Sequence, residues 1–108
     1  MNYNISTINN FRKEARRLIK KYPSLQNELS KLGEQLAENP TSGISLGNSC
    51  YKIRIAIASK GTGRSGGARV ITFVYHAETT VFLLSVYDKS EKSNISNNEL
   101  NILLKLIL

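Results

Sequence analysis

The 108-residue chain has few of the residues that mark secreted, metal-binding or membrane-spanning proteins. Cys50 is its single cysteine, so no disulfide can form within the chain, and with one histidine it offers no Cys/His cluster for zinc. The N-terminal residues lack the apolar core of a signal peptide. The most apolar run, LNILLKLIL, is far shorter than the roughly 20 residues that cross a bilayer. We therefore expect a cytoplasmic protein without a metal site or membrane anchor.

Acidic residues are also scarce, since 8 Asp and Glu stand against 15 Lys and Arg. The net charge of +7 and the pI of about 9.8 favour a polyanionic partner, which could be nucleic acid, an acidic protein or an anionic membrane surface. At 41% hydrophobic residues, a chain of this length can bury one modest core. We expect a single domain over residues 1–108 and no cofactor.

Residues 61–66 read GTGRSG, which matches the G-x-G-x-x-G pattern of dinucleotide-binding turns. Such a site needs a strand before the glycines, a helix after them and an acidic residue about 20 residues further on. The preceding YKIRIAIA is strand-like, but ARVITFVYH after Gly67 is rich in β-branched and aromatic residues without helical spacing. The glycines therefore predict a loop between two strands, which we call the glycine loop, and not a nucleotide site.

Apolar residues at helical spacing dominate the first part of the chain. They predict one amphipathic helix over roughly residues 7–22, ended by Pro23, and a second from about Ser24 to Glu38. The short turn between them indicates a helical hairpin. The polar face of the first helix has one acid, Glu14, among six cations, and such a charge run is more typical of a solvated face than of a binding stripe. The cations are Arg12, Lys13, Arg16, Arg17, Lys20 and Lys21.

From Cys50 onward the pattern changes to alternation, which is typical of strands. Three strands are predicted over residues 50–58, 69–76 and 81–88, and residues 41–48 are expected to be a polar connection. The second strand is apolar on both faces, which indicates a central position in the sheet.

Ser96-Asn97-Asn98-Glu99 is a capping-box pattern, and it predicts a short apolar helix that continues to Leu108. The order of the elements predicts an α+β fold. In it the N-terminal helical hairpin packs on one face of a small antiparallel sheet, and a short C-terminal helix follows.

Charged residues identify the sheet face that is turned away from the helical hairpin, because they cannot be buried unpaired. We call this face the outer face. In the first strand, alternation directs the isoleucines to the hairpin and Lys52 and Arg54 to the outer face. In the third strand, it directs Phe82, Leu84 and Val86 to the core.

The outer face is expected to be open, basic and aromatic, with Lys60 and Arg64 on the glycine loop above it. Such a surface suits a phosphodiester backbone and stacked bases. Cations on strands also protect sheet edges, so alternation alone leaves the simpler reading open. His76 is expected at the surface, and Cys50 as a small strand residue. The expected outer-face residues are Lys52, Arg54, Arg69, Leu83, Ser85, Tyr87 and Lys89.

Three segments of the chain resemble the RelE/ParE superfamily of bacterial toxins from type II toxin–antitoxin modules, and HigB-type ribosome-dependent mRNA interferases most closely. CYKIRIA at residues 50–56 is similar to the basic strand of this family. SKGTGRSGGARVITFVY at residues 59–75 is similar to its loop and arginine-bearing strand. FLLSVYDKSEKSNIS at residues 82–96 is similar to its last strand and the residues that follow it.

The resemblance implies a microbial-RNase-like fold and metal-independent cleavage of mRNA in the ribosomal A site. It implies a cognate antitoxin, often of the helix-turn-helix type, and contact with operator DNA only through that antitoxin. The catalytic residues implied are Lys52, Arg54, Arg69, Tyr87 and Lys89. The candidates for contact with RNA or the ribosome are Lys60, Arg64, Arg12, Arg16 and Lys20.

RNA cleavage by its own 2′-hydroxyl needs a base, an acid and cations that stabilise the phosphorane. Lys52 is the candidate base, Arg54 and Arg69 are candidate stabilisers, and Tyr87 is a candidate for stacking or proton donation. Many relatives place a tyrosine or histidine near the C-terminus, whereas residues 90–108 contain neither. Two alternatives therefore stand: a ParE-like inhibitor of DNA gyrase that cuts nothing, and an inactive module whose basic surface binds an acidic partner.

Overall fold

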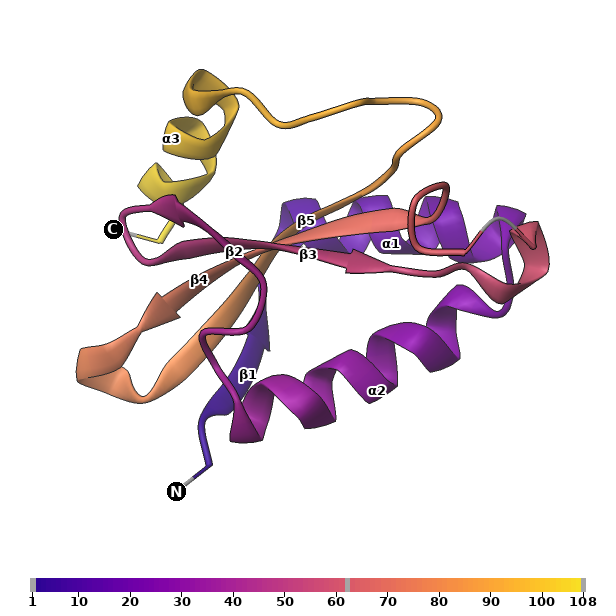
Figure 1. Ribbon diagram of the computed structural model, residues 1–108. Coiled ribbons are helices and arrows are strands. Elements are labelled where there is room, and N and C mark those ends of the chain that lie inside the picture. Colours follow the sequence, from indigo (N-terminus) through magenta and orange to yellow (C-terminus); the bar gives the residue numbers. More distant parts are fainter. Residues whose placement is uncertain (1, 62, 108) are drawn as a thin grey trace.

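A five-stranded sheet forms the centre of the protein, with two helices on one face and one on the other (Figure 1). The strand order is β1-β5-β4-β3-β2, and all neighbours are antiparallel except β1 and β5, which run parallel. The computed structural model describes residues 2–61 and 63–107. The main elements are β1 (Asn4–Thr7), α1 (Asn9–Lys21), α2 (Leu25–Glu38), β2 (Ile44–Gly47), β3 (Cys50–Ile55), β4 (Ala68–Tyr75), β5 (Thr80–Asp88) and α3 (Asn97–Lys105), and two 3₁₀ turns cover Ala58–Lys60 and His76–Glu78.

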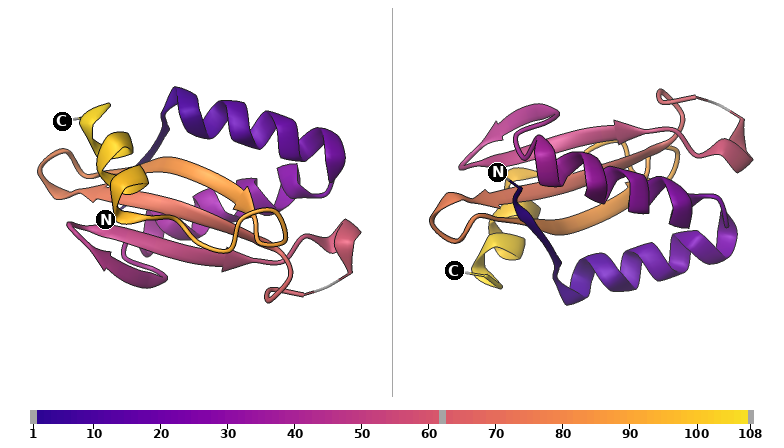
Figure 2. Two further views of the ribbon diagram at one scale, coloured as in Figure 1. Left: turned by 90° about the horizontal axis from the view of Figure 1, so that it is seen from above. Right: turned by 90° about the horizontal axis from the view of Figure 1, so that it is seen from below.

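The predicted helical hairpin is present and covers one face of the sheet. Buried residues of α1 recur four and three positions apart, at Phe11, Ala15 and Leu18, which is the spacing of one helical face. These side chains and the buried leucines of α2 form one core with Ile53, Val70 and other inward residues of the strands. Figure 2 shows this layer from below, where α1 and α2 run lengthwise along the sheet and meet at the turn that joins them.

β4 is the central strand, as its two apolar faces predicted. Val70 and Val74 contribute to the core under the helical hairpin, whereas Ile71 and Phe73 contribute to a second core on the outer face. Every residue of β4 except Tyr75 is buried. The whole fold is therefore of the predicted α+β class, with a hydrophobic layer on both sides of this strand.

The C-terminal helix α3 closes the second core. The predicted capping box is formed, because the Glu99 N–H donates to Ser96 Oγ at 3.1 Å and the Ser96 N–H donates to Glu99 Oε1 at 3.1 Å. Buried leucines of α3, Leu100, Leu103 and Leu104, pack with Ile71, Phe73, Leu84 and Tyr87. Leu108, the expected end of this helix, lies outside the described residues. The outer face is thus partly covered, and not open as expected.

Two short edge strands were not predicted from the sequence. β1 pairs in parallel with β5, so the sheet is mixed and not purely antiparallel. β2 lies within the segment expected to be a polar connection, and it turns into β3 through residues with positive φ at Gly47, Asn48 and Ser49. Four-residue strands are too short to show alternation, and most of their residues are polar or exposed.

An irregularity in β5 changes which side chains face the helical hairpin. Ile71 pairs with Ser85 but Thr72 pairs with Leu83, so β5 has one extra residue at this point. Val81, Leu83 and Val86 consequently lie in the core under the hairpin, and Phe82 and Leu84 lie against α3. The prediction that Phe82 and Leu84 share a face with Val86, and that Leu83 lies on the outer face, is therefore wrong.

Gly67 marks a close approach of two chain segments, and this can be tested by substitution. A Cβ at Gly67 would lie 3.0 Å from Ala56 Cα and would collide with the Ile55 carbonyl oxygen. We expect Gly67→Ala to lower the free energy of unfolding by about 1–3 kcal/mol, because backbone must shift to admit the methyl group. Gly33→Ala is the matched control, since nothing lies within 4 Å of the added Cβ in α2. It should raise stability by about 0.5–1 kcal/mol. Urea denaturation followed by circular dichroism measures both, and equal midpoints would contradict the expectation.

Candidate active site

Three of the predicted catalytic residues form a row across the sheet. Arg54 of β3 is opposite Arg69 of β4, and Arg69 is opposite Tyr87 of β5. Residues directly opposite each other on neighbouring strands share a face, so all three belong to the outer face, as predicted. The sequence pattern identified this row correctly, but it did not show which members are accessible.

Arg69 is buried under the glycine loop, which spans residues 56–67. Its side chain and backbone are together 3% exposed. Nη1 donates to the Arg64 carbonyl oxygen at 2.8 Å and to the Ala68 carbonyl oxygen at 3.2 Å, and Nη2 donates to the Ser65 carbonyl oxygen at 3.3 Å. Burial, together with the positive charge of Arg54, lowers the pKa of Arg69. The expectation of an open position for Arg69 is therefore wrong, because the loop folds back over it.

Tyr87 is also covered, in this case by α3 and the segment before it. The residue is 4% exposed, and Lys92 Nζ lies 5.3 Å from the centroid of its ring. Burial raises the pKa of the phenol, outweighing the opposite influence of Arg69 and of the Ile95 N–H. That N–H does not reach normal hydrogen-bond geometry, and the hydroxyl has no partner in the described part of the chain. The phenol is therefore a protonated group without an acceptor, and it is shielded from solvent.

The accessible cations gather at the edge of β3. A surface hollow there, which we call the basic hollow, is lined by Gly43, Ile44, Lys52, Ile53, Arg54 and Arg64. Arg54 and Arg64 are exposed, and the half-buried Lys52 donates from Nζ to Asn94 Oδ1 at 3.4 Å. No carboxylate belongs to the described lining. Three cationic side chains around one hollow provide donors for a phosphate group, and the two guanidinium groups could bind it bidentately.

Lys60 does not extend over the outer face as predicted. Its Nζ donates to Asp88 Oδ1 at 2.8 Å and to Ser90 Oγ at 3.2 Å, and the side chain is 11% exposed. Asp88 is fully buried. Burial alone would raise the pKa of Asp88, but hydrogen bonds from Lys60 and Ser90 lower it to about 2. The sequence analysis missed Asp88, although an acid at the end of an apolar strand is a visible signal.

The remaining predicted cations are divided between two places. The half-buried Lys89 connects β5 to the glycine loop, since its N–H donates to the Gly67 carbonyl oxygen at 3.0 Å. Arg12, Arg16 and Lys20 lie on α1 and line a groove with apolar residues of that helix and with a residue of α2. The structure therefore does not bring the three α1 cations to the basic hollow.

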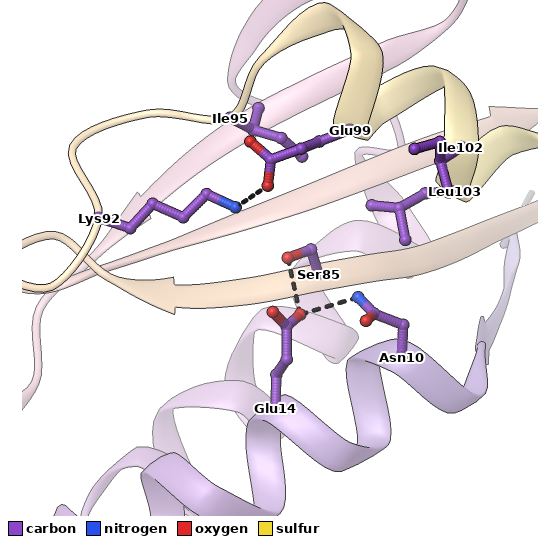
Figure 3. A pocket seen from close by; sticks show the side chains of 8 residues that line it. All are labelled: Asn10, Glu14, Ser85, Lys92, Ile95, Glu99, Ile102 and Leu103. Carbon is purple, nitrogen blue, oxygen red and sulfur yellow. Dashed lines mark hydrogen bonds and ion pairs between the residues drawn. The ribbon is translucent and has the colours of Figure 1, made fainter.

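Glu14 is not an isolated surface acid of α1, as Figure 3 shows. Its Oε1 accepts from Asn10 Nδ2 at 2.9 Å, from Ser85 Oγ at 2.7 Å and from the Val86 N–H at 3.3 Å. Asn10 Nδ2 also donates to the Leu84 carbonyl oxygen at 3.0 Å. These hydrogen bonds satisfy backbone groups of β5 beyond Leu83, the last residue paired with β1. Ser85 therefore bonds to α1 at this edge of the sheet and does not belong to the predicted binding face.

Other reactive groups lie apart from this region. Burial raises the pKa of Cys50 to about 11, which leaves the thiol protonated at neutral pH. His76 is exposed and lies 3.1 Å from the Tyr3 hydroxyl, through Nδ1. Among residues 2–61 and 63–107, no group of His, Cys, Asp and Glu could hold a metal ion, and no helix is long and apolar enough to cross a membrane.

Comparison with known proteins gives consistent matches. A family model described as the RelE toxin of the RelE/RelB toxin–antitoxin system matches residues 6–107. A free double mutant of E. coli toxin RelE is 23% identical over 100% of both chains, with a TM-score of 0.68. The intact E. coli RelBE toxin–antitoxin complex contains a chain 26% identical over 80% of this chain and 95% of that one, with a TM-score of 0.62. The toxin–antitoxin complex RelBE2 of Mycobacterium tuberculosis contains a chain 15% identical over 82% of this chain and 99% of that one, with a TM-score of 0.59.

The buried Asp88 carboxylate should make the stability of the protein depend on pH in the acidic range. Its pKa is about 2 in the folded protein, below its ordinary value of 3.8. The contribution, about 2 kcal/mol, is therefore present above pH 4 and is lost as the pH falls from about 4 through 2. In Asp88→Asn this dependence is absent, so the difference in unfolding free energy between parent and variant should shrink over that interval. Urea denaturation at pH 6, 4, 3 and 2 measures it, and a constant difference would show that the carboxylate has an ordinary pKa.

Proposed function

Because the chain belongs to the family of RelE toxins of toxin–antitoxin systems, we propose that it is a ribosome-dependent endoribonuclease that cleaves mRNA in the A site and so inhibits translation. The observation that carries this proposal is the basic hollow, where Lys52, Arg54 and Arg64 surround a space without a carboxylate in its described lining. A phosphodiester placed there would have cationic donors on several sides. We further propose that the protein acts in the cytoplasm and that, within the family, it is most similar to the HigB-type interferases.

The proposed chemistry uses the RNA's own nucleophile. The 2′-hydroxyl attacks the adjacent phosphorus and gives its proton to a base, for which Lys52 is the candidate. The leaving 5′-oxygen takes a proton from an acid, and the products are a cyclic phosphate and a 5′-hydroxyl. Arg54 and Arg64 would stabilise the two negative charges of the phosphorane, because guanidinium groups match the geometry of phosphate oxygens.

Arg69 and Tyr87 have different places in this proposal. The buried guanidinium of Arg69 lies next to Arg54 and adds positive potential to the site without facing solvent. Tyr87 could stack on a base or donate its proton only after α3 and residues 89–96 move, since its hydroxyl is shielded. Lys60 forms a buried ion pair with Asp88, so we assign it no contact with RNA.

A ParE-like inhibitor of DNA gyrase is the alternative function. The observations that favour it are the shielded phenol of Tyr87 and the absence of any tyrosine or histidine after that residue in the sequence. Mapping of mRNA 5′ ends after expression separates the two functions. Cuts within translated codons support the endoribonuclease, whereas loss of supercoiling with intact mRNA supports the alternative.

A cognate antitoxin is the proposed protein partner, as in the solved RelBE complexes. We expect it to be of the helix-turn-helix type and to provide the contact with operator DNA. Besides the basic hollow, the C-terminal end of α3 offers a surface for it, because Ile102 of α3 and Leu106, the residue directly after the helix, are 61% and 65% exposed. Large exposed apolar side chains at one end of a short helix are typical of a contact surface.

Substitution of Arg54 tests the active-site assignment without disturbing the fold. Arg54→Ala should slow ribosome-dependent cleavage by roughly 10²–10³-fold, because one phosphate-directed donor is lost. Stability should not fall, since Arg54 is exposed and lies beside another cation. Lys13→Ala on α1 removes an exposed cation outside the hollow and is the matched control. Cleavage is measured with purified ribosomes and mRNA, and a folded Arg54→Ala that cleaves like the parent would overturn the assignment.

Substitutions in α3 separate contact with the antitoxin from packing. The double variant Ile102→Ser/Leu106→Ser changes only exposed side chains, so unfolding free energy should stay within about 0.5 kcal/mol of the parent. The affinity for the cognate antitoxin should fall at least about tenfold, which corresponds to 1.4 kcal/mol. Leu103→Ala removes a buried side chain and should cost about 2–5 kcal/mol of stability. Calorimetric titration and thermal melting measure these effects, and unchanged affinity of the double variant would exclude α3 as the contact surface.

A further inference from the structure

We propose that Asp88 is a positioning residue of the active site: its ion pair with Lys60 fixes the glycine loop, and the loop in turn holds Arg69 and Arg64 in place. Asp88 does not line the basic hollow, and within the described part of the chain the hydrogen bonds to its carboxylate come from Lys60 and Ser90, to which no step of the reaction is assigned. The proposal rests on the proposed endoribonuclease function, but the part that concerns the loop can be tested separately.

The environment of Asp88 is unusual for a residue with only a packing role. Its Oδ1 accepts three hydrogen bonds, from Lys60 Nζ at 2.8 Å, from the Ser90 N–H at 3.0 Å and from Ser90 Oγ at 2.8 Å. Its Oδ2 is buried and has no partner in the part of the chain that the structure describes. Desolvation of the unsatisfied oxygen offsets part of the attraction between the carboxylate and Lys60, so the ion pair contributes less stability than a fully hydrogen-bonded carboxylate would. This desolvation cost suggests that the ion pair holds the glycine loop in position, in addition to its contribution to stability.

Lys60 attaches the first half of the glycine loop to the body of the protein. Besides its bond to Asp88, its Nζ lies 5.5 Å from the ring centroid of Tyr22 at the end of α1. The neighbouring Ser59 adds a second attachment, since its N–H donates to Ser24 Oγ at 3.1 Å and the two hydroxyl oxygens are 2.7 Å apart. The buried ion pair and the core side chain of Ile57 thus both hold this half of the loop.

The second half of the loop supplies the acceptors for Arg69. The carbonyl oxygens of Arg64 and Ser65 accept from its guanidinium at 2.8 and 3.3 Å. Arg54 lies opposite Arg69 and repels it, so the guanidinium depends on these two carbonyls, together with that of Ala68 in β4, to stay in place. Arg64 also lines the basic hollow, so the same loop sets the position of a second cation. Release of Lys60 would therefore disturb both arginines at once.

Another acid near the same segment offers a matched control. Glu91 pairs with Arg17 at 2.8 Å, but the side chains of Glu91 and Arg17 are 38% and 57% exposed. Exposed pairs contribute little to stability, and this one connects α1 to the residues after β5 without involving the glycine loop. Glu91→Gln therefore removes one carboxylate charge three residues from Asp88 and should leave the arginines of the site where they are.

The test compares Asp88→Asn, Lys60→Met, the double variant and Glu91→Gln by enzyme kinetics and by amide hydrogen exchange. We expect Asp88→Asn and Lys60→Met to lower kcat by about 10²-fold, as for a misplaced reacting group. The KM for mRNA-programmed ribosomes should stay the same. Both variants should exchange the hydrogen-bonded backbone amides of the loop, those of Ser59, Lys60, Gly61 and Gly67, faster than the parent while β4 and β5 remain protected. The double variant should be no worse than either single variant, because both act through one ion pair. It also removes both charges together and keeps the test available if a single variant does not fold.

Two results would overturn the proposal. One is unchanged amide exchange in the loop of folded Asp88→Asn. The other is a kcat, corrected for the folded fraction, that equals the kcat of the parent and of Glu91→Gln, because this would leave Asp88 with a purely structural role. If the parent cleaves no mRNA, the proposed function fails. The exchange data then decide alone whether Asp88 fixes the loop.

Discussion

The buried guanidinium of Arg69 is the constraint on which the arrangement of the outer face depends. A cation with 3% exposure beside a second cation needs acceptors, and here the acceptors are backbone carbonyls of Arg64, Ser65 and Ala68. The carbonyls of Arg64 and Ser65 reach it because the glycine loop folds back over β4. The close approach at Gly67, where a side chain would meet β3, is part of the same requirement. The ion pair between Lys60 and Asp88 fixes the other half of that loop.

A second requirement concerns the edge of β5. β1 pairs with only the first part of this strand, and beyond Leu83 its backbone groups need other partners. Asn10 and Glu14 of α1 provide them, so a polar pair within an otherwise basic helix fixes α1 against the sheet. The extra residue in β5 lies at the same place, and it turns Val86 toward the core while Tyr87 faces α3. The unpaired edge of β5, the extra residue in this strand and the position of α1 therefore depend on one another.

Much of the fold follows from patterns of near neighbours in the sequence. Helical spacing and Pro23 located α1 and α2, alternation located β3, β4 and β5, and the capping box located the start of α3. What could not be predicted depends on contacts between distant segments. β1 exists because β5 offers it an edge, and the irregularity in β5 reverses the side-chain alternation that was used to assign Phe82 and Leu84. The same holds for the candidate site: the row of Arg54, Arg69 and Tyr87 was predictable, but its coverage by the loop and by α3 was not.

The pairing of β1 with β5 also bears on the time at which the protein completes its fold during synthesis. Asn4 lies opposite Thr80, so the partners of this parallel pair are 76 positions apart in the sequence. Contacts of such sequence separation form late, because a long loop must be closed before they are gained. On the ribosome, β1 and the helical hairpin emerge first and have no sheet to pack against until β4 and β5 have left the exit tunnel. The basic hollow at β3 therefore acquires its final shape only after most of the chain has been translated.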